Sequence, residues 1–326
     1  MTRLSSQASL NAYQGCPLCS STDSREIASE LRRGIGTVLY CASCDHGYLV
    51  NYESIDAKKY YSDLYRQEYS HNADASKTHA EEIFSVYSKF QDSRLQHIIP
   101  LVNSSTRLLE VGASAGQFLT HLKGIALELN AIELDKDCCS YLQNQLHIEA
   151  DSEFLENSRF SANVYDVVCA FQVIEHVEKP VAFLQTLRQA TRKGGSIFIE
   201  APNLYDPLLS VWNVPAYHKF FYHSAHLHYF TESSLAKVAI DAGFSPDCIE
   251  FIFTQDYNLL NHLHWINTNS PQSDCHLGLS DININGHNDE ISSWLTNELV
   301  TLNSKYINLL SSMKCTSNIL MKIKND

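Results

Sequence analysis

The sequence contains no uninterrupted run of 18 or more apolar residues, so we predict no segment that crosses a membrane. It also lacks any lysine- and arginine-rich tract, and its formal net charge is −13. A chain this acidic repels phosphate backbones, which makes nucleic acid a poor candidate for its partner. The first 14 residues are polar and lack an apolar signal core, so we expect a cytoplasmic protein.

Three zones follow one another along the 326 residues. We expect residues 1–75 to form a cysteine-containing module with a tyrosine-rich segment, and residues 76–255 to form the main domain. Residues 256–326 are predicted to form a polar loop and an amphipathic C-terminal helix that packs on the core. A homodimer contact through that helix is the alternative.

The middle zone alternates strand-like and helix-like segments. Apolar strands are expected at 107–111, up to 133, at 165–171 and at 196–200, with helices at 77–102, 115–122, up to 141 and at 180–190. This repeated order predicts right-handed crossovers and a doubly wound, mainly parallel α/β sheet. Such sheets bind ligands beyond the carboxyl ends of their strands, where we look for functional residues.

A glycine-containing loop follows the first of these strands. The strand carries Glu110, and glycines follow at positions 112 and 116. This spacing differs from the dinucleotide pattern G-x-G-x-x-G, and no Gly-Lys-Ser/Thr follows, which excludes a P-loop. Glu133 ends the next strand, where an acidic side chain can accept hydrogen bonds from ribose hydroxyls. The alternative is an ordinary strand–turn–helix with a solvated glutamate.

The segment 165–177 adds a third signature, an apolar strand followed by Phe171-Gln172-Val173-Ile174-Glu175-His176. Over residues of about 105–245 the chain resembles the class I S-adenosylmethionine-dependent methyltransferases, nearest to the ubiquinone-biosynthesis-like small-molecule branch. The resemblance implies a Rossmann-like sheet of seven strands. It also implies cofactor contacts: the methionine part at Glu110, Gly112, Ala113 and Gly116, the ribose at Glu133, the adenine at Asp151, and the sulfonium beside Phe171 and Gln172.

Histidines are the main candidates to contact the molecule that accepts the methyl group. His176, next to Glu175, is placed to take a proton from an attacking hydroxyl, or else it packs against the following helix. Some relatives bind a divalent metal through E-x-x-E-H here, but Gln172 replaces the first glutamate, which weakens that reading. The aromatic segment 201–230 contains His226 and His228, which would share one face of an extended chain. We interpret this segment as a substrate wall, with packing over the sheet as the alternative.

Cysteines form two closely spaced pairs near the N-terminus, Cys16/Cys19 and Cys41/Cys44, separated by 21 residues. Two C-x2-C knuckles of this kind predict a closed tetrahedral zinc site with a structural role. A redox dithiol is the alternative. With Tyr60, Tyr61, Tyr65 and Tyr69, this region is similar to the N-terminal part of bacterial sugar and natural-product methyltransferases, where it covers the mouth of the active site.

Together these features favour methyl transfer to a small-molecule acceptor. We expect O-methylation of a sugar, nucleotide-sugar or secondary-metabolite intermediate, with a histidine as general base. A methyltransferase of RNA or protein that uses the zinc module for recognition is an alternative, as is a non-catalytic cofactor-binding scaffold. The chain lacks the Asn/Asp-Pro-Pro-Tyr/Phe motif of base amino-methylation, and its acidic and glycine positions are intact, which opposes both alternatives.

Overall fold

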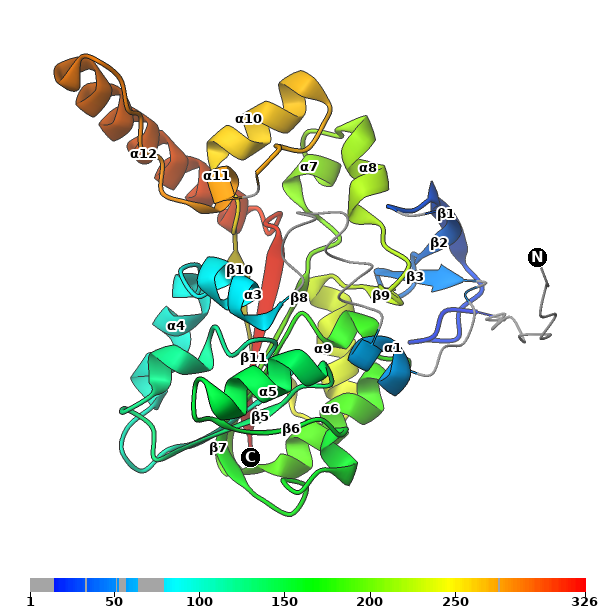
Figure 1. Cartoon of the computed structure of the whole chain (residues 1–326). Coiled ribbons are helices and arrows are strands. Elements are labelled where there is room, and N and C mark those ends of the chain that lie inside the picture. The colour runs from blue at the N-terminus through cyan, green and yellow to red at the C-terminus, as the bar shows by residue number, and fades with distance from the viewer. Residues whose placement is uncertain (1–14, 33, 51, 53–56, 64–78, 275) are drawn as a thin grey trace, which may run out of the picture.

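The computed structural model describes residues 15–32, 34–50, 52, 57–63, 79–274 and 276–326. Tyr65 and Tyr69 lie outside these ranges. The described chain forms a seven-stranded sheet flanked by helices and a separate four-stranded sheet (Figure 1). None of the helices in these ranges is long and apolar enough to span a bilayer.

The large sheet confirms the predicted doubly wound, mainly parallel architecture. Its strands β4, β5, β6, β7 and β8 pair in parallel, and only β11 runs antiparallel to its neighbours β8 and β10. In sheet order the strands are β10 (Ile249–Thr254), β11 (Asn318–Asn325), β8 (Thr191–Pro202), β7 (Tyr165–Phe171), β4 (Arg107–Val111), β5 (Glu128–Ile132) and β6 (Glu149–Asp151).

Helices cover both faces of this sheet because its strands present apolar side chains on both sides. On one face α4 (Asp92–Ile98) and α5 (Lys136–Asn144) pack through residues such as Leu142, with α3 (Ala80–Tyr87) beside α5. On the other face α6 (Pro180–Ala190) and α9 (Glu232–Asp241) pack through residues such as Leu235. The strand order brings the carboxyl ends of β4, β5, β7 and β8 to one edge.

Two predicted helices differ in the structure. The expected helix 77–102 is two helices, α3 and α4, followed by a 3-10 turn at Ile99–Leu101, because the Gln91 side chain donates to the Tyr87 carbonyl and ends α3. The expected helix 115–122 is only a 3-10 turn at Leu119–Leu122. Ser114 and Gly116 have positive φ angles of 49° and 79°, which cannot continue a right-handed helix.

The last zone contributes more to the core than a loop and a helix. The sequence analysis missed β11, whose Ile319, Leu320, Met321 and Ile323 are fully buried between β8 and β10. The predicted helix is α12 (Asp289–Ser312), but its expected packing on the core is limited, since Leu310 is its only buried residue. The remaining helices of this zone are α10 (Leu259–Thr268) and α11 (His276–Leu279).

The N-terminal module forms the four-stranded sheet. Its strands β1 (Ser24–Glu30), β2 (Ile35–Cys41) and β3 (His46–Val50) form an antiparallel meander. The fourth strand is β9 (His228–Tyr229), which lies far along the chain and pairs with β3. The short helices α7 (Pro207–Ser210) and α8 (Pro215–Phe221) precede β9, and α1 (Ala57–Asp63) follows β3.

Candidate active site

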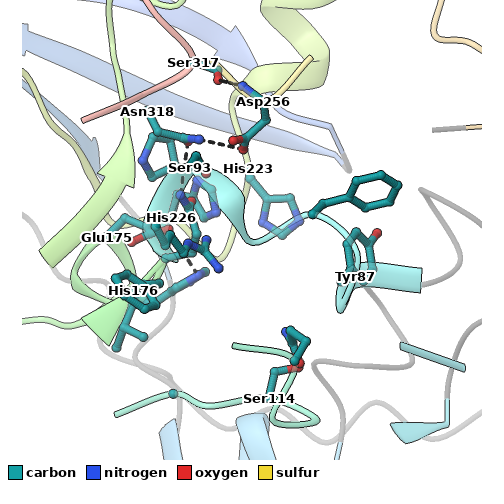
Figure 2. A pocket seen from close by; sticks show the side chains of 18 of the residues that line it. Tyr87, Ser93, Ser114, Glu175, His176, His223, His226, Asp256, Ser317 and Asn318 are labelled. Carbon is teal, nitrogen blue, oxygen red and sulfur yellow. Dashed lines mark hydrogen bonds and ion pairs between the residues drawn. The ribbon is translucent and has the colours of Figure 1, made fainter. Parts of the chain in front are cut away.

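A cavity of about 1410 Å³ opens at the carboxyl ends of β4, β5, β7 and β8. It exceeds the roughly 300–1,000 Å³ typical of pockets for one small ligand, so it offers room for two. Its lining comes from the glycine loop, the segment after β7, the aromatic segment 201–230 and the C-terminal zone (Figure 2). Figure 2 places Glu175, His176 and His226 together, with Ser114 on a different part of the lining.

The loop after β4 turns sharply because Gly112 adopts a φ angle of 78°. A Cβ atom there would lie 2.4 Å from Cγ2 of Val173, so glycine is needed for both the φ angle and the close approach. Gly116, with a φ of 79°, instead faces Leu142 and Leu146 of the α5 region. The second glycine therefore serves packing against α5 and does not line the cavity.

Glu110 lies at the base of the cavity with 3% of its surface exposed. Its Oε2 atom has no hydrogen-bond partner among the described residues. Burial raises the pKa of this carboxyl well above its usual value. A buried carboxyl oxygen without a hydrogen-bond partner costs free energy, so Glu110 is a candidate to bind a hydrogen-bond donor or a cation.

Glu133 links the ends of β4 and β5. Its Oε2 accepts the amide of Ser114 at 2.5 Å, and its Oε1 accepts the amide of Asp135 at 2.8 Å. Both bonds fix the carboxylate at the edge of the cavity, where Glu133 is 9% exposed. The Glu133 carboxylate is therefore held in a fixed position where the cavity begins.

The other proposed cofactor residues divide into two groups. Phe171 and Gln172 line the cavity, whereas Ala113 and Asp151 do not. The Asp151 carboxylate accepts bonds from the Ser158 hydroxyl and the Arg159 amide, both at 2.9 Å, and so turns away. Phe154 and Leu155, which follow β6, reach the cavity in its place.

The three proposed catalytic residues come together. Glu175, His176 and His226 offer ligand atoms that all lie within 4.8 Å of one another. His176 Nδ1 lies 2.9 Å from the carbonyl oxygen of Ala225, and the two imidazole centroids lie 4.8 Å apart. A carbonyl only accepts, so Nδ1 carries the proton and Nε2 carries the lone pair.

Burial sets the charge of this cluster. It lowers the pKa of His176 to about 4 and that of His226 well below its usual value, so both imidazoles are neutral at pH 7. Burial also raises the pKa of Glu175 to about 8. Neither carboxyl oxygen of Glu175 has a hydrogen-bond partner among the described residues, although Oε1 lies 3.8 Å from His176 Nε2. At pH 7 the cluster therefore presents two neutral imidazoles beside a mainly protonated carboxyl.

The same three side chains are candidates to hold a divalent cation. Gln172 is held beside these residues by its amide nitrogen, which donates to Glu200 and Asn318, both at 3.1 Å. Gln172 thus belongs to a structural network beside the cavity. A two-histidine, one-carboxylate set remains the most that these residues offer to a metal.

Several cavity residues were absent from the sequence interpretation. Arg94 of α4 makes a bidentate ion pair with Glu200 and lies over the Phe171 ring at 4.6 Å. Asp256 accepts from the Asn318 amide at 2.6 Å, and its pKa is raised by burial to about 6. The strand–helix pattern could not reveal these residues, because α4 and the segment after β10 reach the cavity only through the tertiary fold.

Aromatic side chains line part of the cavity, and some of them come from the segment 201–230. Tyr217, Phe220 and Phe221 of α8 line the cavity with Trp265 of α10, whose ring centroid lies 5.0 Å from that of Tyr217. Tyr61 of α1 also lines it, with its ring 5.7 Å from the His176 ring. The N-terminal region therefore reaches the cavity.

His226 and His228 do not act as a pair. His226 faces the cavity, whereas His228 is 1% exposed in β9. His228 Nδ1 lies 2.9 Å from Nε2 of His46 in β3. The reason is that only residues 228–229 are extended, so the preceding loop turns His226 toward His176.

The four paired cysteines form one cluster. All four sulfur atoms lie within 4.8 Å of one another, and the pairs Cys16–Cys44 and Cys19–Cys41 are each 3.5 Å apart. Four thiolates at about 2.3 Å from one tetrahedral ion would stand about 3.8 Å apart. The arrangement thus fits a closed four-cysteine zinc site.

Comparison with known proteins identifies the family of this chain. Residues 78–249, more than half of the chain, match the family described as methyltransferase domain. A stretch of 64 residues is 38% identical to a mitochondrial ubiquinone biosynthesis O-methyltransferase of Dictyostelium discoideum, covering 20% of this chain and 16% of that relative.

Two solved structures are also similar. A SAM-dependent methyltransferase from Archaeoglobus fulgidus is 17% identical, with a TM-score of 0.48 over 75% of this chain and 97% of that one. A possible histamine N-methyltransferase from Thermotoga maritima is 16% identical, with a TM-score of 0.47 over 76% and 94%. At these scores neither likeness bears on function. On the family match and its sheet, this chain belongs to the methyltransferase-domain family, as a class I S-adenosylmethionine-dependent member.

Proposed function

We propose that this protein transfers a methyl group from S-adenosylmethionine to a hydroxyl of an uncharged small molecule, with His176 as general base. The observation that carries the proposal is the placement of neutral His176 and His226 on the same cavity as Glu110 and Glu133. The carboxyl groups of Glu110 and Glu133 suit binding of the methyl donor. The imidazoles of His176 and His226 suit binding of the methyl acceptor.

The donor end of the cavity fits the cofactor. The unused oxygen of Glu110 suits the amino group of the methionine part, and the Glu133 carboxylate, fixed at the edge of the cavity, suits the ribose hydroxyls. When bound, the cofactor supplies an activated methyl on a sulfonium. Phe171 and Gln172 also line the cavity and are the residues we expect beside that methyl.

On the acceptor side, His176 Nε2 holds the lone pair that receives the proton of the acceptor hydroxyl as the oxygen attacks. The Glu175 carboxyl, 3.8 Å away, would then ionise more readily, because a neighbouring positive charge favours the carboxylate. His226, in edge contact with His176, would orient the hydroxyl. Much of the rate would come from this positioning.

The charge of the lining narrows the acceptor class. The cavity is lined by ten carboxylic side chains but only four from lysine and arginine. Such a surface repels a diphosphate, so among the expected acceptors an uncharged sugar or secondary metabolite fits better than a nucleotide-sugar. The aromatic wall of Tyr217, Phe220 and Trp265 suits the apolar faces of such rings.

We propose a structural role for zinc at the cysteine cluster, because four thiolates leave no open position for a substrate or water. We also propose the three predicted zones, 1–75, 76–255 and 256–326, as units of function, with the last one supplying β11 to the core sheet and Trp265 to the acceptor wall.

Calorimetric titration with S-adenosylmethionine tests the donor site. We expect micromolar binding to the zinc-loaded protein and at least tenfold weaker binding to Glu133→Ala. Glu149→Ala removes an exposed carboxylate from neighbouring β6 and should bind like wild type. Failure of the folded wild-type protein to bind would overturn the proposal. A screen of methyl acceptors comparing neutral sugars and phenols with nucleotide-sugars and RNA then tests the acceptor class.

A further inference from the structure

Helix α12 presents an apolar face that the described part of the chain does not cover. The helix has 24 residues, about 36 Å at 1.5 Å per residue, and its first half projects away from the sheets (Figure 1). The exposed large apolar side chains include Ile291 (61%), Trp294 (62%), Leu302 (52%) and Leu309 (56%). Exposed apolar groups concentrated on a projecting element mark an interaction site.

These side chains form one stripe. At 100° per residue, Ile291, Leu302 and Leu309 fall within about 20° of one direction, with Leu295 and Trp294 on either side. The contacts of α12 with the body lie on another face: Leu310 is buried, and Tyr306 accepts from the Trp212 indole at 2.8 Å. The stripe is therefore not the face that holds the helix on the protein.

Two opposite charges interrupt the stripe. Glu298 and Lys305 lie seven residues apart, about 10.5 Å along the axis, so they are too distant to pair within one helix. Neither makes an ion pair within the described part of the chain. An acid and a base placed symmetrically on an apolar stripe can neutralise each other when the helix meets an antiparallel copy of itself.

We infer that α12 is the surface through which two copies of this chain pair, antiparallel, about a two-fold axis between residues 301 and 302. In this register Glu298 faces the partner's Lys305 and Trp294 faces the partner's Leu309, each contact occurring twice as two-fold symmetry requires. Leu302 lies beside the axis and meets the partner's Leu302. The two bodies stay at opposite ends of the helix pair.

This inference is independent of the proposed methyl transfer. A lipid surface is the competing occupant of an amphipathic helix, but interfacial helices usually carry several basic residues, whereas α12 has one lysine and three acidic residues. The net charge of −13 also opposes attraction to anionic lipids. The self-complementary charges favour a second copy.

Sedimentation equilibrium of the full zinc-loaded chain tests the pairing. We expect a dimer of the 36.8 kDa chain, lost in Leu302→Lys, which puts two like charges at the axis. Val300→Lys is the matched control: Val300 is also exposed (43%) but points to the opposite side of α12, so this variant should remain dimeric. Circular dichroism and S-adenosylmethionine binding establish that both variants are folded.

Charge reversal tests the register. Glu298→Lys or Lys305→Glu alone should weaken the dimer about tenfold, and the double variant should restore it. A monomeric wild-type protein at high micromolar concentration would overturn the inference. So would equal effects of Leu302→Lys and Val300→Lys, a double variant no tighter than the singles, or a monomer that sediments with phosphatidylcholine vesicles.

Discussion

His46 Nε2 and His228 Nδ1 lie 2.9 Å apart in the buried interior, joining the cysteine module to the segment that carries the acceptor-side histidines. The backbone makes the same link, since Leu49 of β3 donates to the Leu227 carbonyl and the Leu227 amide donates to the Glu175 carbonyl. Asp45, next to Cys44, adds a third link by accepting from the Thr231 hydroxyl. Hydrogen bonds thus connect the backbone of Glu175, through Leu227, to strand β3 of the cysteine module.

Loss of zinc should accordingly affect the acceptor more than the cofactor. In Cys41→Ser we expect about one zinc per chain to be lost, a lower melting temperature, and a larger rise in the acceptor KM than in the dissociation constant for S-adenosylmethionine, because Glu133 lies on the core sheet. Cys248→Ser, outside the cluster, is the control. Unchanged zinc content by metal analysis would contradict the proposed site.

Replacing the proposed base should reduce turnover without loss of the cofactor. His176→Asn removes the lone pair of Nε2, and we expect kcat to fall by about 10²–10⁴. S-adenosylmethionine affinity by calorimetry should stay within a few fold. His147→Asn, which changes an exposed histidine with a φ of 53°, should have wild-type kcat. A His176→Asn enzyme with normal kcat would exclude His176 as the base.

The pH profile should show the lowered pKa of His176. The neutral imidazole is the reactive form, and burial lowers its pKa from 6.5 to about 4. Activity is therefore retained as pH falls through 6.5 and is lost only as pH approaches 4. We would measure kcat/KM from pH 8 to the lower limit of folding. A decline centred near 6.5 would show instead that the catalytic imidazole is solvated.

The glycine loop permits a paired comparison. Gly112 and Gly124 share positive φ angles of 78° and 77°, but a Cβ on Gly112 meets Val173 at 2.4 Å whereas one on Gly124 meets nothing within 4 Å. Gly124→Ala should cost only the φ strain, about 1–2 kcal/mol of unfolding free energy. Gly112→Ala should cost more and weaken S-adenosylmethionine binding.

Adding Val173→Ala to Gly112→Ala should recover part of that loss, because it removes the clashing methyl group while the φ strain remains. Urea unfolding measures the stability of each variant. Equal costs at positions 112 and 124 would mean that the loop moves aside to accept the side chain.

The sequence allowed prediction of the features that local chemistry determines. An apolar run predicts the strand 165–171, and a proline in the first turn predicts the start of the helix 180–190. Acidic residues that follow apolar runs place Glu110 and Glu133 at the ends of strands. The same logic could not find β11, because a short apolar segment after a helix shows its role only when β8 and β10 lie on both sides. Arg94 was missed for a similar reason, since its partner Glu200 lies 106 residues away.

In the candidate site, too, some features follow from the local sequence and others depend on the tertiary fold. The cysteine spacing alone indicated a four-sulfur cluster, and the structure brings those sulfurs together. The separation of His226 from His228 could not be foreseen, because it depends on β9 pairing with a strand about 180 residues earlier. Asp151 lies at the end of β6, where the resemblance implies an adenine contact. Its carboxylate instead accepts hydrogen bonds from the Ser158 hydroxyl and the Arg159 amide.

The position of β11 has a consequence for synthesis of the protein. While the ribosome is still making residues 318–325, β8 and β10 have no strand between them, and β8 presents an open apolar edge. The sheet can close only after these residues leave the exit tunnel, so its completion depends on contacts between distant parts of the chain. Nascent chains stalled before β11 should therefore be the species most in need of chaperones.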